Sequence, residues 1–278
     1  MKKFILWFLA FVITIGAAYY QRKTGPTYPK RIDVTLNNTV HELKLVRSLS
    51  LEERSAVKLN ITDPAVKARL FFKRYKSDEE YQVSDFIYGA EPKKEGFYAE
   101  IQQQPPAGKL QYYFEITDSN GTKSYFKDSP IVVRFKGSVP AYILVPHILL
   151  MFMAMLFSTL AGLMAVIKFP LYKKYALWTL IFFTAGGMVL GPIVQYDAFG
   201  DLWTGIPFGW DLTDNKTLIA FLFWIMAVVM NRKKDKPLYT ALAAFVLLLV
   251  YSIPHSLFGS ELDYSSGQVT QGIILNFF

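Results

Sequence analysis

The chain has 278 residues, of which 52% are apolar, and 30 Lys and Arg against 22 Asp and Glu give a formal net charge of +8. This hydrophobicity excludes a disordered nucleic-acid-binding tail despite the basic balance, so nucleic acid is not an expected partner. The absence of cysteine excludes disulfides, iron–sulfur clusters, thiolate zinc sites and cysteine nucleophiles. The distribution of the charges along the chain therefore matters more than their total.

The N-terminal apolar run, Phe4–Tyr20, follows two lysines. A basic start, a short apolar core and the small residues Gly16-Ala17-Ala18 are typical of a cleavable signal peptide. The aromatic flank Tyr19-Tyr20, followed by further basic residues, is typical of an uncleaved anchor, which we favour. Residues 1–20 are therefore predicted to be a transmembrane anchor or a signal peptide, and in both alternatives the next part of the chain is exported.

Residues 28–137 have the composition of β structure, with alternating apolar or β-branched residues and no helical period. The turn signals Asn37-Asn38 and Asn120-Gly121 separate such segments. About eight short strands in about 110 residues predict an exported β-sandwich domain. The predicted strands are Ile32–Leu36, Val40–Val46, Ala56–Ile61, Ala68–Tyr75, Gly96–Ile101, Leu110–Thr117, Thr122–Phe126 and Ile131–Phe135.

The run Gly108–Gly121 (GKLQYYFEITDSNG) resembles the penultimate strand and last hairpin of immunoglobulin and fibronectin type III domains. Those domains carry a tyrosine at a corner of this strand. The resemblance implies that Tyr112 or Tyr113 fills that position and that the fold is Ig-like or fibronectin III-like. It implies a fold and not a function.

Four basic residues gather on one predicted strand of this domain: Arg69, Lys73, Arg74 and Lys76. They could contact anionic lipid headgroups or an acidic partner. The alternative, which we favour, is an ordinary solvated strand face.

From Pro140 onward the sequence consists mainly of apolar runs with few charges. A bilayer core of about 30 Å needs about 20 helical residues, and two of the runs meet this length outright. The run Leu218–Met230, the fourth span of the chain, reaches this length only when Leu212–Thr217 is added to it. The fifth span, Leu238–Ile253, is marginal in length. The runs are Ala141–Ile167, Tyr175–Val194, Leu218–Met230 and Leu238–Ile253.

We therefore predict a membrane α-helical bundle of about five transmembrane helices, with an all-β Ig- or fibronectin III-like sandwich between helices 1 and 2. Residues 141–255 form a four-helix transmembrane domain, and residues 256–278 form an exported C-terminal tail.

The loops near the membrane differ sharply in charge. The loops predicted inside carry nine basic residues and one acid, namely Lys2, Lys3, Lys168, Lys173, Lys174, Arg232, Lys233, Lys234, Lys236 and Asp235. The opposite loops carry one basic residue and six acids, namely Lys216, Asp197, Asp201, Asp211, Asp214, Glu261 and Asp263. We predict that the membrane is a bacterial inner membrane. The positive-inside rule then places the N-terminus on its cytoplasmic side and residues 21–140 and the C-terminus on the outer side.

Two Pro-His pairs lie at the predicted outer ends of the second and fifth spans, at Pro146-His147 and Pro254-His255. His147 and His255, together with Asp211 and Asp214, could bind a divalent metal. The two histidines could instead ligate a b-type haem. The alternative that we favour is local hydrogen bonding by the histidines and helix capping by the carboxylates, with Asp214 or Thr213 as the N-cap of the fourth span.

No P-loop, metalloprotease or serine-hydrolase motif is present, so an enzyme is not the first expectation. We expect an accessory or interaction protein of a bacterial envelope complex, whose exported sandwich contacts a membrane or periplasmic protein while the helices hold it in the lipid bilayer. A metal- or haem-binding membrane redox protein or enzyme using His147 and His255 is the second hypothesis. A small-solute facilitator is the third.

Overall fold

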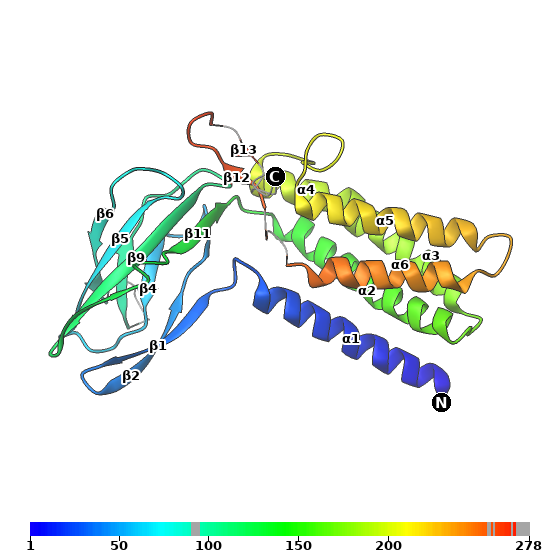
Figure 1. Ribbon diagram of the computed structural model, residues 1–278, viewed down its shortest axis with the longest axis horizontal. Coiled ribbons are helices and arrows are strands. Elements are labelled where there is room, and N and C mark those ends of the chain that lie inside the picture. Colours follow the sequence, from blue (N-terminus) through cyan, green and yellow to red (C-terminus); the bar gives the residue numbers. More distant parts are fainter. Residues whose placement is uncertain (90–94, 255–256, 258, 268, 271–278) are drawn as a thin grey trace. The chain divides into compact units, whose positions relative to one another are not determined.

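The computed structural model describes the chain except for residues 90–94, 255–256, 258, 268 and 271–278. The described part divides into two compact units (Figure 1). The helical unit comprises Met1–Pro26 and Val139–Ser260, and the β unit comprises Thr27–Ser138 and Glu261–Thr270. Each unit has its own hydrophobic core.

The helical unit contains long, apolar helices. They are α1 (Lys2–Thr24), α2 (Ala141–Val166), α3 (Tyr172–Phe183), the π-helical turn η1 (Thr184–Leu190), α4 (Gly191–Phe199), α5 (Leu212–Met230) and α6 (Pro237–Ser252). Four stretches are long and apolar enough to cross a membrane: α1, α2, the continuous stretch Tyr172–Phe199, and α5. These helices indicate a membrane protein, as predicted. The fifth expected span corresponds to α6, whose 16 residues extend about 24 Å, less than a bilayer core of about 30 Å.

Helix α2 packs against α1, α3, η1 and α6. Small residues allow two of these close approaches. A Cβ added to Gly162 would lie 2.5 Å from the Cβ of Ala244 on α6, and one added to Gly186 would lie 2.9 Å from the Cβ of Leu150. Larger side chains at either glycine would push the helices apart.

The charged loops are sorted between the two ends of this bundle. At the basic end, defined by residues 167–174 and 231–236, Lys173 pairs with Asp235 and the Tyr172 hydroxyl donates to Asn231. At the acidic end, defined by residues 195–216 and 253–254, the Lys216 ammonium donates to the carbonyl of Ile253 at 2.8 Å. The two basic loops between helices therefore lie at one end of the bundle, and residues 195–216 and 253–254 lie together at the other, whereas Glu261 and Asp263 belong to the β unit.

The β unit contains all thirteen strands of the described chain: β1 (Lys30–Leu36), β2 (Thr39–Leu45), β3 (Ser48–Ser50), β4 (Ala56–Leu59), β5 (Lys67–Arg74), β6 (Gln82–Asp85), β7 (Ile87–Tyr88), β8 (Phe97–Glu100), β9 (Lys109–Asp118), β10 (Gly121–Tyr125), β11 (Ile131–Lys136), β12 (Glu261–Leu262) and β13 (Val269–Thr270). One sheet has the order β3-β11-β9-β5-β6, with β10 also paired to β9, and a second has the order β4-β8-β7. The β1-β2 and β12-β13 hairpins form separate two-stranded sheets.

A single hydrophobic cluster draws side chains from both larger sheets and from the β1-β2 hairpin. Tyr112 is fully buried in it, and its hydroxyl donates to the carbonyl of Val46 at 2.8 Å. Tyr112 is therefore the more deeply buried tyrosine of the predicted pair, since Tyr113 is 8% exposed. It contacts the connection between β2 and β3, whereas in Ig domains the corner tyrosine contacts backbone a few residues away.

The C-terminal hairpin, β12 and β13, belongs to the β unit although the helices α2 to α6 separate it from the other strands in sequence. The backbone N–H of Leu262 donates to the carbonyl of Ala107 at 3.1 Å. Part of the segment predicted as a tail, 256–278, is thus a component of the β domain.

Candidate functional site

His147 lies in the second turn of α2 and is half-buried beside η1. Its Nδ1 lies 2.9 Å from the carbonyl oxygen of Gly186. Since a carbonyl oxygen only accepts, the neutral imidazole carries its proton on Nδ1 and leaves the Nε2 lone pair available. The same oxygen accepts the N–H of Gly191, five residues on, which is the hydrogen bond of a π turn. The π turn therefore orients the imidazole.

Asp214 lies in the first turn of α5 and is only 5% exposed. Its Oδ2 accepts the backbone N–H of Thr204 at 2.6 Å, the hydroxyl of Thr204 at 3.2 Å and the side-chain amide of Gln195 at 3.1 Å. The carboxylate therefore binds the connection between α4 and α5.

Asp211 is the N-cap of α5, with its Oδ1 accepting the N–H groups of Thr213 at 2.7 Å and Asp214 at 3.2 Å. The predicted N-cap, Asp214 or Thr213, is wrong, because the helix begins earlier, at Leu212. The N-terminal part of α5 also buries Lys216, which is 4% exposed.

The predicted metal ligands are thus engaged in local contacts. The structure brings Asp211 and Asp214 together, but His147 contacts Gly186, and His255 lies outside the described residues. Across the described ranges, no group of three or more histidines and carboxylates could hold a metal ion. A metal site at this end of the bundle remains a prediction that depends on His255.

The basic cluster on β5 and the turn that follows it is paired within the β unit. Each of its four cations contacts an oxygen atom of the same unit, and these contacts favour the interpretation of a solvated strand face. The contacts are Arg69 with Glu115 at 2.9 Å, Lys73 with the carbonyl of Ser77 at 3.0 Å, Arg74 with Glu79 at 3.3 Å, and Lys76 with Glu261 at 3.2 Å.

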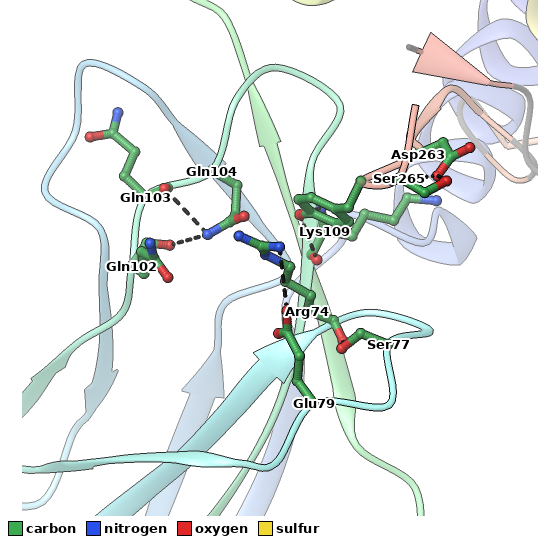
Figure 2. Close-up of polar contacts among 10 residues, drawn as sticks. Arg74, Ser77, Glu79, Gln102, Gln103, Gln104, Lys109, Asp263 and Ser265 are labelled. Atoms are coloured by element: carbon green, nitrogen blue, oxygen red, sulfur yellow. Dashed lines mark hydrogen bonds and ion pairs between the residues drawn. The ribbon is translucent and has the colours of Figure 1, made fainter. Parts of the chain in front are cut away.

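The C-terminal hairpin is held at the start of β9 by a polar cluster that the sequence did not indicate. Figure 2 shows Arg74, Lys109 and the turn residue Asp263 close together. The Tyr264 hydroxyl accepts the N–H of Lys109 at 3.0 Å and lies 3.1 Å from the Lys109 carbonyl, to which it donates. The Arg74 guanidinium lies over the Tyr264 ring, 4.8 Å from its centroid. Because β5 ends at Arg74, the hydroxyl supplies the hydrogen bond that a longer strand would have made with Lys109.

Charge strengthens this attachment. The carboxylate of Glu261 lies 2.9 Å from the Lys109 ammonium and 3.2 Å from that of Lys76. Burial opposes ionisation of Glu261, but the hydrogen bond and the attraction of both ammonium groups hold its pKa below the ordinary value. Burial lowers the pKa of Lys109, and its hydrogen bond and charge attraction to Glu261 only partly offset this lowering. In the turn, hydrogen bonds from Ser265 and Ser266 lower the pKa of Asp263 to about 2.

The segment Gln82–Tyr88 runs along the edge of both larger sheets. It pairs with β5 as β6 and then with β8 as β7, and Phe86 is buried at the change of sheet. Within the described chain, neither strand has a partner on its other side. Val83 is 55% exposed and Ile87 is 64% exposed, which is unusual for an unprotected edge.

The register shows which backbone groups this edge offers. The N–H of Phe86 donates to the carbonyl of Ala68, so these residues form a hydrogen-bonded pair. Because such pairs alternate along an antiparallel ladder, Val83 and Asp85 direct their N–H and C=O groups away from β5. The sequence pattern did not indicate this segment because its exposed residues do not alternate with buried ones.

Comparison of the chain with protein-family models, with curated proteins and with solved structures finds no match.

Proposed function

We propose that the protein is a membrane-anchored interaction protein whose β domain binds an extended segment of a membrane or periplasmic partner. The observation that carries this proposal is the edge Gln82–Tyr88, with the outward-facing N–H and C=O groups of Val83 and Asp85 and the exposed side chains of Val83 and Ile87. An added strand would satisfy the peptide groups and cover the apolar side chains, which is the mode of binding called β-augmentation.

The strand order supports an Ig-like sandwich as the framework for this edge. The order β4-β8-β7 corresponds to B-E-D, and the order β11-β9-β5-β6 corresponds to G-F-C-C′ of a variable-type domain. In this correspondence β6 is the C′ edge strand. Domains of this architecture commonly bind other proteins, although the fold alone does not establish a function.

The helices would hold this domain outside a bacterial inner membrane. Two loops that the Lys173–Asp235 ion pair joins at one end of the bundle carry seven basic residues and one acid, whereas Asp211 and Asp214 lie at the other end, and this distribution supports an orientation with the basic end inside. The N-terminus would then be inside, and the β domain outside.

Photo-crosslinking in the host cell tests the partner site. A benzophenone amino acid at Ile87 is expected to form an adduct with one protein. The same group at Lys67, which is exposed on the interior strand β5, is expected to form none.

The substitution Val83→Pro removes an outward N–H without removing a ladder hydrogen bond, so it should abolish the Ile87 adduct and leave the domain folded. Val83→Ala retains the N–H and serves as the matched control, with the adduct weakened but present. An adduct from Ile87 that survives V83P in a folded protein would refute strand addition.

A second function, metal or haem binding at His147 with His255, is favoured by one observation. The Nδ1–H of His147 is held by a backbone carbonyl, which is the usual way in which proteins orient a ligating imidazole. Elemental analysis and the visible spectrum of the purified protein test this function. A purified protein that is free of metal and colourless, and whose metal content and spectrum do not change in His147→Ala, would exclude this second function.

A further inference from the structure

Residues 200–211, here called the aromatic loop, connect α4 to α5 and are bound to the first turn of α5. The N–H of Thr204 donates to Asp214 at 2.6 Å, and the N–H of Ile206 donates to the side chain of Asn215 at 2.7 Å. The loop backbone therefore has a defined conformation, anchored by side chains of the helix at its C-terminal end.

The loop packs directly on that helix. A Cβ added to Gly205 would lie 2.6 Å from the Cβ of Asp214, so only glycine permits this approach. The loop is also closed on itself, because the N–H of Asp211 donates to the carbonyl of Thr204 at 3.1 Å and the indole of Trp203 donates to the carbonyl of Ile206 at 3.1 Å. Many of its polar backbone groups are thus satisfied without water.

Most of the large outward side chains of this loop are apolar, and Asp201 at its start is its exposed charged residue. Four large side chains are exposed to 46–81%, namely Leu202, Ile206, Phe208 and Trp210. The loop contains no lysine or arginine. An apolar surface of this kind on a fixed backbone is suited to a permanent apolar or interfacial environment.

We propose that the aromatic loop inserts its apolar side chains into the interface between lipid headgroups and acyl chains. The proposal rests on the membrane placement of the helices in the proposed function. Both ends of the loop continue directly into α4 and α5, so the loop must lie at a membrane surface. Tryptophan and other aromatic side chains prefer this zone, and irregular backbone tolerates it where its polar groups are satisfied. The loop then sets the depth of the α4–α5 end of the bundle in the bilayer.

Spin labelling tests this inference, because the chain has no cysteine and each introduced thiol is unique. Phe208→Cys and Leu202→Cys are labelled with a nitroxide in the full-length protein, reconstituted into phospholipid nanodiscs. Collision with apolar oxygen and with a water-soluble nickel chelate is then measured. We expect both loop labels to collide more often with oxygen than with the chelate.

Two further labels serve as references. Ile181→Cys, at an exposed position of α3, reports membrane insertion itself, and Lys123→Cys, on the exposed strand β10, reports water. If the loop labels are accessible to the chelate while the Ile181 label is accessible to oxygen, the inference about the loop is overturned and the membrane placement of the helices stands. Loop labels inaccessible to both reagents would also overturn it, by showing that a protein covers the loop. A chelate-accessible Ile181 label would refute the membrane placement.

Discussion

Replacing Tyr264 by phenylalanine removes one oxygen atom from the C-terminal hairpin. The lost hydroxyl accepts the N–H of Lys109 and donates to the carbonyl of the same residue. The carbonyl keeps a second partner, because the N–H of Tyr75 donates to it at 3.0 Å. The Lys109 N–H has no such substitute among the described residues, so Y264F leaves a partly buried donor unpaired.

The free-energy cost of Y264F depends on how many hydrogen-bond partners the Lys109 N–H and carbonyl retain. A net hydrogen bond contributes about 0.5–1.5 kcal/mol, and an unpaired buried donor costs about 1–3 kcal/mol. Since Tyr264 is half-buried and water can reach part of the site, we expect Y264F to weaken hairpin attachment by about 1–2 kcal/mol. This corresponds to a change of about five- to thirty-fold in the opening equilibrium.

Hydrogen exchange measures this equilibrium in the full-length protein. The amide of Leu262 is the reporter, because its hydrogen bond to Ala107 breaks when the hairpin detaches. Tyr81→Phe is the matched control. Among the described residues the Tyr81 hydroxyl accepts a hydrogen bond from the side-chain amide of Gln111 alone, and that amide can turn to solvent, so we expect the exchange rate of Leu262 to change by about two-fold or less. Unchanged exchange of Leu262 in Y264F would show that the hydroxyl does not hold the hairpin.

Three further changes have expected outcomes. Because the pKa of Glu261 is held below its ordinary value of 4.5, the carboxylate stabilises the attached hairpin fully above that pH, and this stabilisation is lost as the pH falls through the lowered pKa. Hydrogen exchange of the hairpin amides should therefore accelerate in that pH range in the wild type but not in E261Q. Equal pH profiles of the two proteins would contradict this. Asn231→Ala removes a buried amide that binds the Tyr172 hydroxyl at 2.8 Å and should cost about 1–3 kcal/mol in detergent, seen as a lower Tm by tryptophan fluorescence; an unchanged Tm would count against it. Gly162→Val should lower the Tm through about 1–3 kcal/mol of overpacking against α6, while Gly16→Val, at a glycine with open space around it, should not; equal effects would refute the contact argument.

Most regular elements were predictable because local pattern determines them. All eight expected strands are present, and most of them bury side chains in a shared core, although β10 exposes four of its five residues. The helices are present because long uncharged runs form them, and α5 does extend back to Leu212. The strands that were missed are short or lie at edges. Strand β6 exposes nearly all its residues, so its sequence has no alternation of apolar and polar residues from which a strand could be predicted.

The candidate sites were less predictable because their residues come from distant parts of the chain. Nothing near Arg69 or Lys76 indicates that Glu115 and Glu261 neutralise them. The π turn that orients His147 depends on how α2 packs against η1, which the sequence pattern does not report.

The sequence by itself determined the two kinds of structure and their order along the chain, because hydrophobic period and run length are local properties. It also determined the grouping of charged loops, because membrane-type helices alternate in direction. Only the tertiary structure decided that Glu261 and Tyr264 complete the β domain, that Gln82–Tyr88 is an unpaired edge of the described sheets, and that Asp214 fixes the aromatic loop. Each of these depends on hydrogen bonds or ion pairs between groups whose contact becomes known only when the chain is folded.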